Sequence, residues 1–154
     1  MSDGITFRYA GAEPTDPDVC LWTTRTLTGE HQSRFLGTVY NLNSDTVLPD
    51  QMRAVLDELW PLAGGRKVER LVSGPGFNSS LHLVYRNEGT ETLTVPAGTF
   101  KTWVLHEMAT GVFGSDASIN NAYWIDQATG VPVRIRENTN GSVYSAELVF
   151  LRLH

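Results

Sequence analysis

The sequence predicts a mainly β (α+β) fold, in which a single curved, half-barrel-like antiparallel sheet wraps around one amphipathic helix. Two observations support this prediction. About ten short segments alternate apolar and polar side chains, with turn residues between them roughly every 8–12 positions. One stretch among them repeats its apolar residues with the period of a helix. Because a long twisted antiparallel sheet must cover its apolar face, we expect it to curl over that helix.

The strand predictions rest on alternation and on β-branched or aromatic content. Ile5, Phe7 and Tyr9 alternate with polar neighbours in the first segment, and later segments repeat this period of two. The glycine-containing segments 29–31 and 87–89 are predicted to be turns, and 111–121 a loop. Strands are predicted at residues 5–9, 18–27, 34–41, 66–73, 81–85, 91–95, 100–108, 122–125, 131–135 and 143–151.

The predicted helix covers Pro49–Leu59. Proline suits the first helical turn, and the acidic Asp50 is favoured at the positive N-terminal end. Pro61 and the glycines after it end the helix. We expect its apolar stripe to pack on the sheet, and binding of a partner protein is the alternative. That stripe consists of Met52, Val55, Leu56, Leu59 and Trp60.

The segment TVPAGTF, residues 94–100, is predicted to be a hairpin corner. Pro96 presets the backbone for a tight turn, and Gly98 supplies a left-handed residue where the next strand begins. Strand-forming residues flank the turn on both sides. Since this geometry is complete without a ligand, the segment needs no functional explanation.

Two longer stretches resemble a group of bacterial envelope domains. They are TETLTVPAGTFKTWVLHE, residues 90–107, and YWIDQATGVPVRIRE, residues 123–137. In that group a VPAGTF-like hairpin precedes a hairpin with Tyr-Trp and Gly-x-Pro-Val. The upstream segment LWPLAGGRKVERL, residues 59–71, is similar to the lead-in of the first long strand.

The resemblance implies a curved antiparallel sheet around a helix. Many of these proteins are uncharacterised secreted or periplasmic proteins, similar in fold to the half-barrels that carry lipoproteins to the outer membrane. Those carriers hold acyl chains on a concave apolar face. The implied location is the periplasm or cell envelope if a leader was trimmed, and otherwise the cytoplasm, since the first residues show no signal segment.

Length and charge set limits on function. With 154 residues the chain is expected to form one domain, residues 1–154. Its net charge is −5 with twelve Lys and Arg, which argues against binding nucleic acid or anionic membranes. No apolar run reaches the roughly 20 residues that a transmembrane helix needs. The oligomeric state is not predictable.

No residue cluster predicts a metal, a cofactor or a catalytic group. The four histidines form no H-x-H pair, although His82 and His106 could meet if their strands pair. The single Cys20 is expected to be a small buried strand residue. Asp126 and Glu147 are the best acid–base candidates. A turn-capping role for Asp126, and solvent exposure or pairing with a nearby arginine for Glu147, are the simpler interpretations.

The aromatic residues are the strongest functional hint. We predict that Trp103, Tyr123, Trp124 and Trp60 line a concave face and bind an apolar small molecule or lipid. Ordinary core packing is the alternative explanation. Three hypotheses follow: a non-enzymatic envelope domain with such a ligand, an interaction or scaffold domain whose cavity the helix plugs, and a small cavity-using enzyme of the isomerase or cyclase type.

Overall fold

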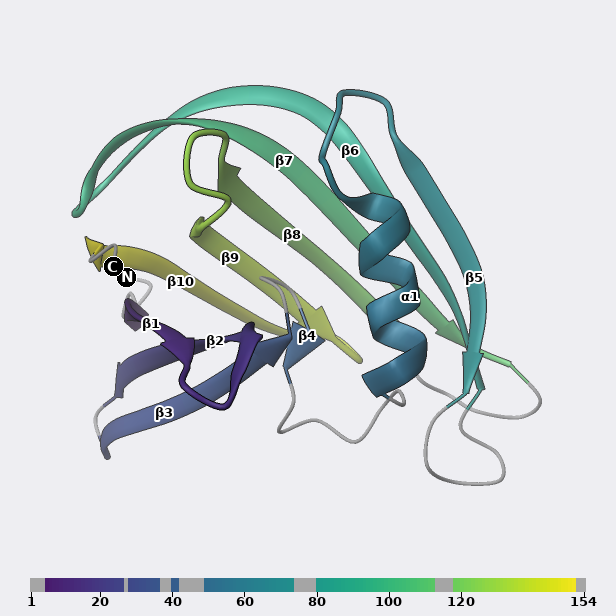
Figure 1. Cartoon of the computed structure of the whole chain (residues 1–154), viewed down its shortest axis with the longest axis horizontal. Helices are drawn as coiled ribbons and strands as arrows, with labels where there is room; N and C mark the ends of the chain where they lie inside the picture. The colour runs from purple at the N-terminus through teal and green to yellow at the C-terminus, as the bar shows by residue number, and fades with distance from the viewer. Residues whose placement is uncertain are drawn as a thin grey trace.

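The computed structural model describes residues 5–26, 28–36, 40–41, 49–73, 80–112 and 118–151. These residues form ten strands and one helix (Figure 1). The elements are β1 (Ile5–Glu13), β2 (Asp16–Thr26), β3 (Gly29–Leu36), β4 (Tyr40–Asn41), α1 (Pro49–Leu59), β5 (Lys67–Ser73), β6 (Ser80–Val95), β7 (Gly98–Gly111), β8 (Ser118–Asp126), β9 (Pro132–Thr139) and β10 (Ser142–Leu151).

All ten strands belong to one sheet, in the order β4-β3-β2-β1-β10-β9-β8-β7-β6-β5. Eight of the nine neighbouring pairs are antiparallel, which confirms the predicted fold class. The exception is the parallel pair β1–β10, which begins at Ile5 and Ala146. This pair joins a four-stranded part, β1 to β4, to a six-stranded part, β5 to β10.

The six-stranded part curves strongly. Figure 1 shows β6 and β7 arching over α1, which lies on the concave side of the sheet. The tip of the β6–β7 hairpin reaches β10, where the amide N–H of Ala97 donates to the carbonyl of Leu148 over 3.1 Å. The sheet therefore covers its own apolar face together with the helix, as expected from its twist.

The apolar stripe of α1 packs into the core, as predicted. Met52 and Leu59 are 1% and 0% exposed, and Val55 and Leu56 are buried with them. The helix packs against β5, where the guanidinium of Arg70 forms an ion pair with Glu58. The helix thus covers the β5 end of the concave side.

The TVPAGTF segment forms the predicted hairpin corner between β6 and β7. Val95 pairs with Gly98, whose φ is +139°, so the left-handed half of the backbone map is used where glycine was expected. The hydroxyls of Thr94 and Thr99 lie 3.0 Å apart across the hairpin. The segment is a structural corner.

The turn predicted at residues 87–89 is wrong. β6 runs without interruption through these residues, and its register with β7 shifts between Asn87 and Thr90. The N–H of Gly89, whose φ is +121°, donates to Oδ1 of Asn87 over 3.0 Å. The same residue types serve a turn and a β-bulge, and here they form a bulge that bends a long strand.

Other boundaries also differ from the predictions. The turn expected at 29–31 lies earlier, since β3 already begins at Gly29 and contains His31. Within the predicted loop 111–121, residues 118–121 belong to β8, while 113–117 lie outside the described residues. Strands extend beyond their apolar cores because backbone pairing continues through polar residues.

Candidate functional site

A row of polar side chains crosses the concave face of the sheet. Tyr85 on β6 pairs with Glu107 on β7, and Glu107 pairs with Asn121 on β8. Along β7, Glu107 stands two residues from Leu105 and two from Ala109, which are 0% and 1% exposed. Because alternate residues of a strand share a face, Glu107 points into the core side of the sheet. It is itself only 8% exposed.

Three donors surround the carboxylate of Glu107. The hydroxyl of Tyr85 donates to Oε2, while Nδ2 of Asn121 donates to Oε1 over 2.7 Å. The hydroxyl of Tyr123 donates to the same Oε1 over 3.3 Å. Oδ1 of Asn121 accepts the backbone N–H of Asn138 over 3.0 Å, which fixes the amide. The buried carboxyl is therefore held in one orientation by hydrogen bonds.

Burial dominates the electrostatics of this row. It raises the pKa of Glu107, although hydrogen bonds from Tyr85, Asn121 and Tyr123 act in the opposite direction. Burial likewise raises the pKa of Glu137. The pKa of Tyr123 lies well above its ordinary value, first because of burial and then because both carboxylates repel a phenolate. The row thus holds protons firmly, as expected for acids in an apolar site.

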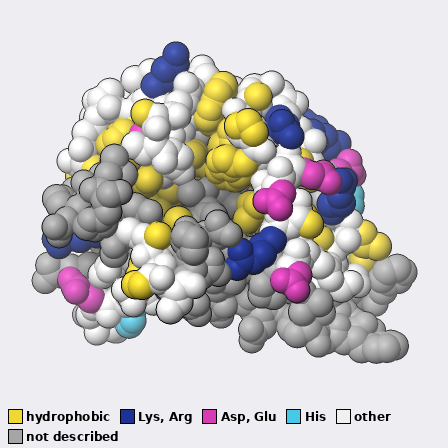
Figure 2. Space-filling view, in the orientation of Figure 1, with side chains coloured by type: hydrophobic (Ala, Val, Ile, Leu, Met, Phe, Trp, Pro, Cys, Tyr) yellow, Lys and Arg dark blue, Asp and Glu magenta, His cyan; other side chains and the backbone are white. Residues whose placement is uncertain are grey.

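A second part of the concave side is apolar. Trp60 and Leu62, in the segment that follows α1, are partly buried and pack against the core. Trp103 on β7 is also partly exposed and lies beside the same segment, since a Cβ added to Gly64 would sit 3.7 Å from its ring. Figure 2 shows hydrophobic side chains gathered on the face of the molecule that carries α1.

Asn87 lies on the same side of the sheet. It pairs with the fully buried Leu105 and is 1% exposed. Its Oδ1 accepts a hydrogen bond from Gly89, but its Nδ2 has no acceptor in the described structure. Buried donors without a partner are rare in folded proteins. This nitrogen is therefore available to donate a hydrogen bond to a bound molecule or a water.

The structure separates the four aromatic residues predicted to bind a ligand. Trp103 pairs with the buried Ile125 on β8, and Tyr123 is 1% exposed in the concave-side row. Trp60 packs against the same core. Trp124 follows Tyr123 directly along β8 and therefore points to the convex side. There its ring nitrogen donates to Glu91 over 2.8 Å.

The predicted acid–base candidates have structural partners. Oδ2 of Asp126 accepts hydrogen bonds from the backbone N–H and hydroxyl of Thr129, over 3.2 and 2.7 Å, so Asp126 caps its own turn. Oε1 of Glu147 accepts two hydrogen bonds from Arg134, over 3.0 and 2.7 Å. Both simpler interpretations are confirmed.

The histidines and the cysteine form no site in the described part of the sheet. β6 and β7 do pair, but His82 lies opposite Thr110 and His106 opposite Arg86, so the two histidines do not meet. Among the residues that the structure describes, no three His, Cys, Asp or Glu side chains are grouped to hold a metal ion. Cys20 was expected to be buried and is only partly so.

Glu107 and Asn87 were missed by the sequence predictions. Glu107 carries a readable signal, because it interrupts an alternating series in which Leu105 and Ala109 occupy the same face. An acidic residue at an apolar position of a strand is a candidate buried carboxyl. Asn87 carries no such signal, since it stands in an Asn-Glu-Gly segment typical of a solvated turn.

Membrane insertion by a helix finds no support in the described residues, where no helix combines the length and the apolar character that crossing requires.

Comparisons with known proteins support the coarser part of the sequence resemblance. Residues 74–149 match the model of DUF3108, a family of proteins of unknown function. The fold is similar to the crystal structure of the hypothetical lipoprotein YmcC from Escherichia coli K12, with a TM-score of 0.52 and 16% sequence identity. That similarity covers 84% of this chain and 70% of that chain. No curated protein matches the chain. The chain is thus similar in sequence over residues 74–149 to a family of unknown function, and similar in fold to a hypothetical lipoprotein.

Proposed function

We propose that this protein is a non-enzymatic cell-envelope domain that binds an apolar or amphiphilic ligand on the concave side of its sheet. The observation that carries the proposal is the group of partly exposed apolar side chains in and beside the segment that follows α1, on a face where Figure 2 shows hydrophobic side chains gathered. Trp60, Leu62 and Trp103 lie in or beside the segment that follows α1 and are partly exposed, whereas Leu59 and Leu105 next to them are buried. Partly exposed aromatic rings in a concave region are typical of small-molecule sites.

An amphiphile suits the site better than a plain hydrocarbon. The apolar part of the amphiphile would lie against Trp60 and Trp103. One of its carbonyl or ester oxygens would accept a hydrogen bond from Nδ2 of Asn87, which has no partner in the described structure. Such an acceptor would remove the free-energy penalty of a buried donor without a partner. Residues 1–154 would act as one domain, a proposal favoured by the single hydrogen-bonded sheet.

The envelope location rests on likeness. The structural neighbour is described as a hypothetical lipoprotein, and the hairpin motifs resemble those of secreted and periplasmic proteins. The periplasm or cell envelope is therefore the proposed compartment.

The alternative is a scaffold domain in which α1 plugs the concave side. It is favoured by the burial of Met52, Val55, Leu56 and Leu59, which already fill the β5 end of the core. In that case the apolar side chains beside the helix would hold no ligand, and the domain would act through a protein partner.

Native mass spectrometry of gently purified protein separates the two functions. Binding predicts species heavier than the bare 17.0 kDa chain, with an extra mass that solvent extraction identifies as an amphiphile. Trp103→Ala should weaken binding of a fluorescent fatty-acid probe about tenfold, since an aromatic contact contributes one to a few kcal/mol. Trp124→Ala is the matched control on the other face and should leave probe affinity within about twofold.

A bare mass together with no probe binding would contradict the proposal and favour the scaffold function. Equal losses in the two variants would show that the ligand does not lie on the concave side.

A further inference from the structure

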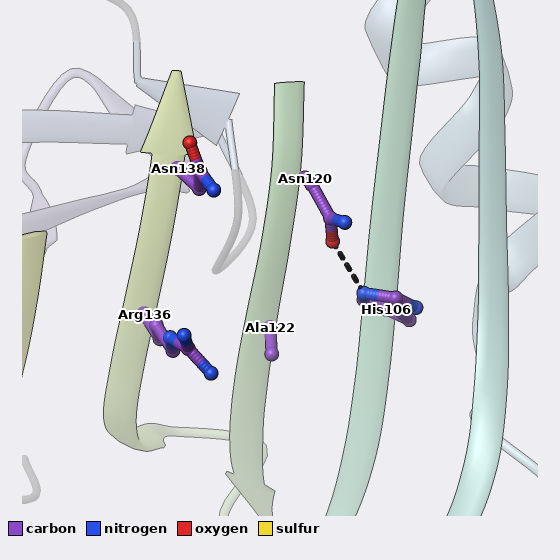
Figure 3. A pocket seen from close by; sticks show the side chains of 5 residues that line it. All are labelled: His106, Asn120, Ala122, Arg136 and Asn138. Atoms are coloured by element: carbon purple, nitrogen blue, oxygen red, sulfur yellow. Dashed lines mark hydrogen bonds between the residues drawn. The ribbon is translucent and has the colours of Figure 1, made fainter. Parts of the chain in front are cut away.

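A polar pocket of about 210 Å³ lies on the convex face, opposite the proposed ligand site. Three neighbouring strands line it, β7, β8 and β9 (Figure 3). Its residues alternate along these strands with the concave-side residues Glu107, Asn121 and Tyr123, so they point the other way. They are His106, Asn120, Ala122, Arg136 and Asn138.

The hollow exists because a short side chain stands between two long ones. Ala122 pairs with His106 on one side and with Arg136 on the other. Neighbouring strands are about 4.8 Å apart, so the two long side chains rise roughly 10 Å from each other over the alanine methyl. Figure 3 shows the guanidinium of Arg136 reaching from β9 toward Ala122.

Both asparagines present spare donors. Oδ1 of Asn120 accepts a hydrogen bond from Nε2 of His106 over 2.6 Å, and Oδ1 of Asn138 accepts the N–H of Gly141 over 3.2 Å. Each acceptor oxygen is thus occupied. Neither Nδ2 donates to any residue in the described part of the chain. The Nδ2 atoms of both asparagines can therefore donate hydrogen bonds to a bound molecule.

Arg136 adds an uncompensated positive charge. Lys67, Arg70 and Arg134 each lie in an ion pair with a glutamate, whereas Arg136 is exposed and has no carboxylate partner in the described structure. An acid lies beside the pocket as well: Oε1 of Glu88 is 3.9 Å from Nδ1 of His106. The pocket itself contains donors and no carboxylate.

We propose that this convex pocket binds the phosphate group of a ligand. The guanidinium of Arg136 and the amide groups of Asn120 and Asn138 line this one pocket from β9 and β8, and a tetrahedral phosphate presents three equivalent oxygens to such donors. The planar fork of arginine matches phosphate oxygens in pairs. The phosphate could belong to a soluble phosphate ester or to a phospholipid headgroup. The site is independent of the concave ligand site.

Titration with glycerol 3-phosphate, followed by amide chemical shifts in NMR spectra, tests the soluble source. Flotation with vesicles of phosphatidylglycerol or of phosphatidylcholine tests the headgroup source. Arg136→Gln should weaken binding about tenfold, as expected for a lost charge-assisted hydrogen bond. The matched control is Arg134→Gln, on the same strand and face but already paired with Glu147, which should change affinity by less than about twofold.

A second variant, Ala122→Leu, fills the pocket without changing its charge. It should abolish binding, while its NMR spectrum remains that of the folded protein. Binding of glycerol 3-phosphate that both pocket variants weaken supports the proposal with a soluble ligand. Binding only to phosphatidylglycerol vesicles, lost in the same variants, supports it with a headgroup. Binding of neither probe, or an equal loss in Arg134→Gln, would overturn it.

Discussion

Two glutamates on opposite faces of this sheet show how differently the faces treat the same side chain. On the concave side, burial raises the pKa of Glu107 despite three hydrogen-bond donors. On the convex side, Glu69 is exposed, and hydrogen bonds from Lys67 and then His82 lower its pKa. The strand register determines whether a glutamate is buried or exposed, because a shift of one residue would exchange the two faces.

Polar groups contribute more to the folding free energy on the concave side than on the convex side. Concave-side groups lie among side chains with almost no exposure, so each needs an internal partner. Convex-side groups such as Glu147 and Arg134 remain about one third exposed, and water can replace either partner. The faces should therefore respond very differently to substitution.

The largest expected effect is a core truncation on β7. Leu105 is 0% exposed and Met108, on the opposite face of the same strand, is 38% exposed. Leu105→Ala should lower the free energy of unfolding by about 2–5 kcal/mol, because it leaves a cavity. Met108→Ala should lower it by no more than about 0.5–1 kcal/mol. Urea unfolding of the two variants measures both, and equal costs would show that the convex side is also covered.

The buried carboxyl should make stability depend on pH. A carboxyl whose pKa is raised on folding holds its proton more tightly in the folded chain than in the unfolded chain. Stability is then fully present below the ordinary pKa of 4.5 and is lost as the pH rises toward the raised value. The loss for one group is at most about 1.4 kcal/mol per pH unit.

Glu107→Gln tests this dependence, since glutamine cannot ionise. Its oxygen can still accept from Asn121, and its amide nitrogen takes the place of Oε2 and can donate to the hydroxyl oxygen of Tyr85. The variant should show a shallower fall of unfolding free energy as the pH rises above 4.5, with the remaining slope owed partly to Glu137, whose pKa is also raised. An unaltered slope in Glu107→Gln would mean that Glu107 does not titrate differently in the two states.

Periodicity predicted much of this fold. The helix stripe from Met52 to Leu59 and the hairpin at Pro96 follow from local chemistry, and the structure places both as expected. The bulge at Asn87 was read as a turn because both features use glycine and asparagine. The parallel pairing of β1 with β10 joins segments more than a hundred residues apart, and no local pattern encodes it.

The site was harder to predict than the fold. Alternation alone separates Tyr123 from Trp124, but it does not say which side is concave. That depends on where α1 lies and how the sheet curls, both of which are long-range properties. Glu107 was missed although it stands at an apolar position of its strand. Its hydrogen-bond partners Tyr85 and Asn121 come from other strands, so the local sequence does not predict them.

The smallest expected effect comes from the convex cluster around Arg134. Its guanidinium bonds Glu147 and lies 5.5 Å from the centre of the Trp124 ring. Arg134→Ala should lower the free energy of unfolding by about 0.5–1 kcal/mol, since partly exposed ion pairs and cation–π contacts are each weak. Unfolding in 1 M salt should reduce this cost, because salt screens exposed charges. If Arg134→Ala lowered the free energy of unfolding as much as Leu105→Ala does, and salt did not reduce the loss, the cluster would lie in a dry environment. A partner covering the convex face would then be required.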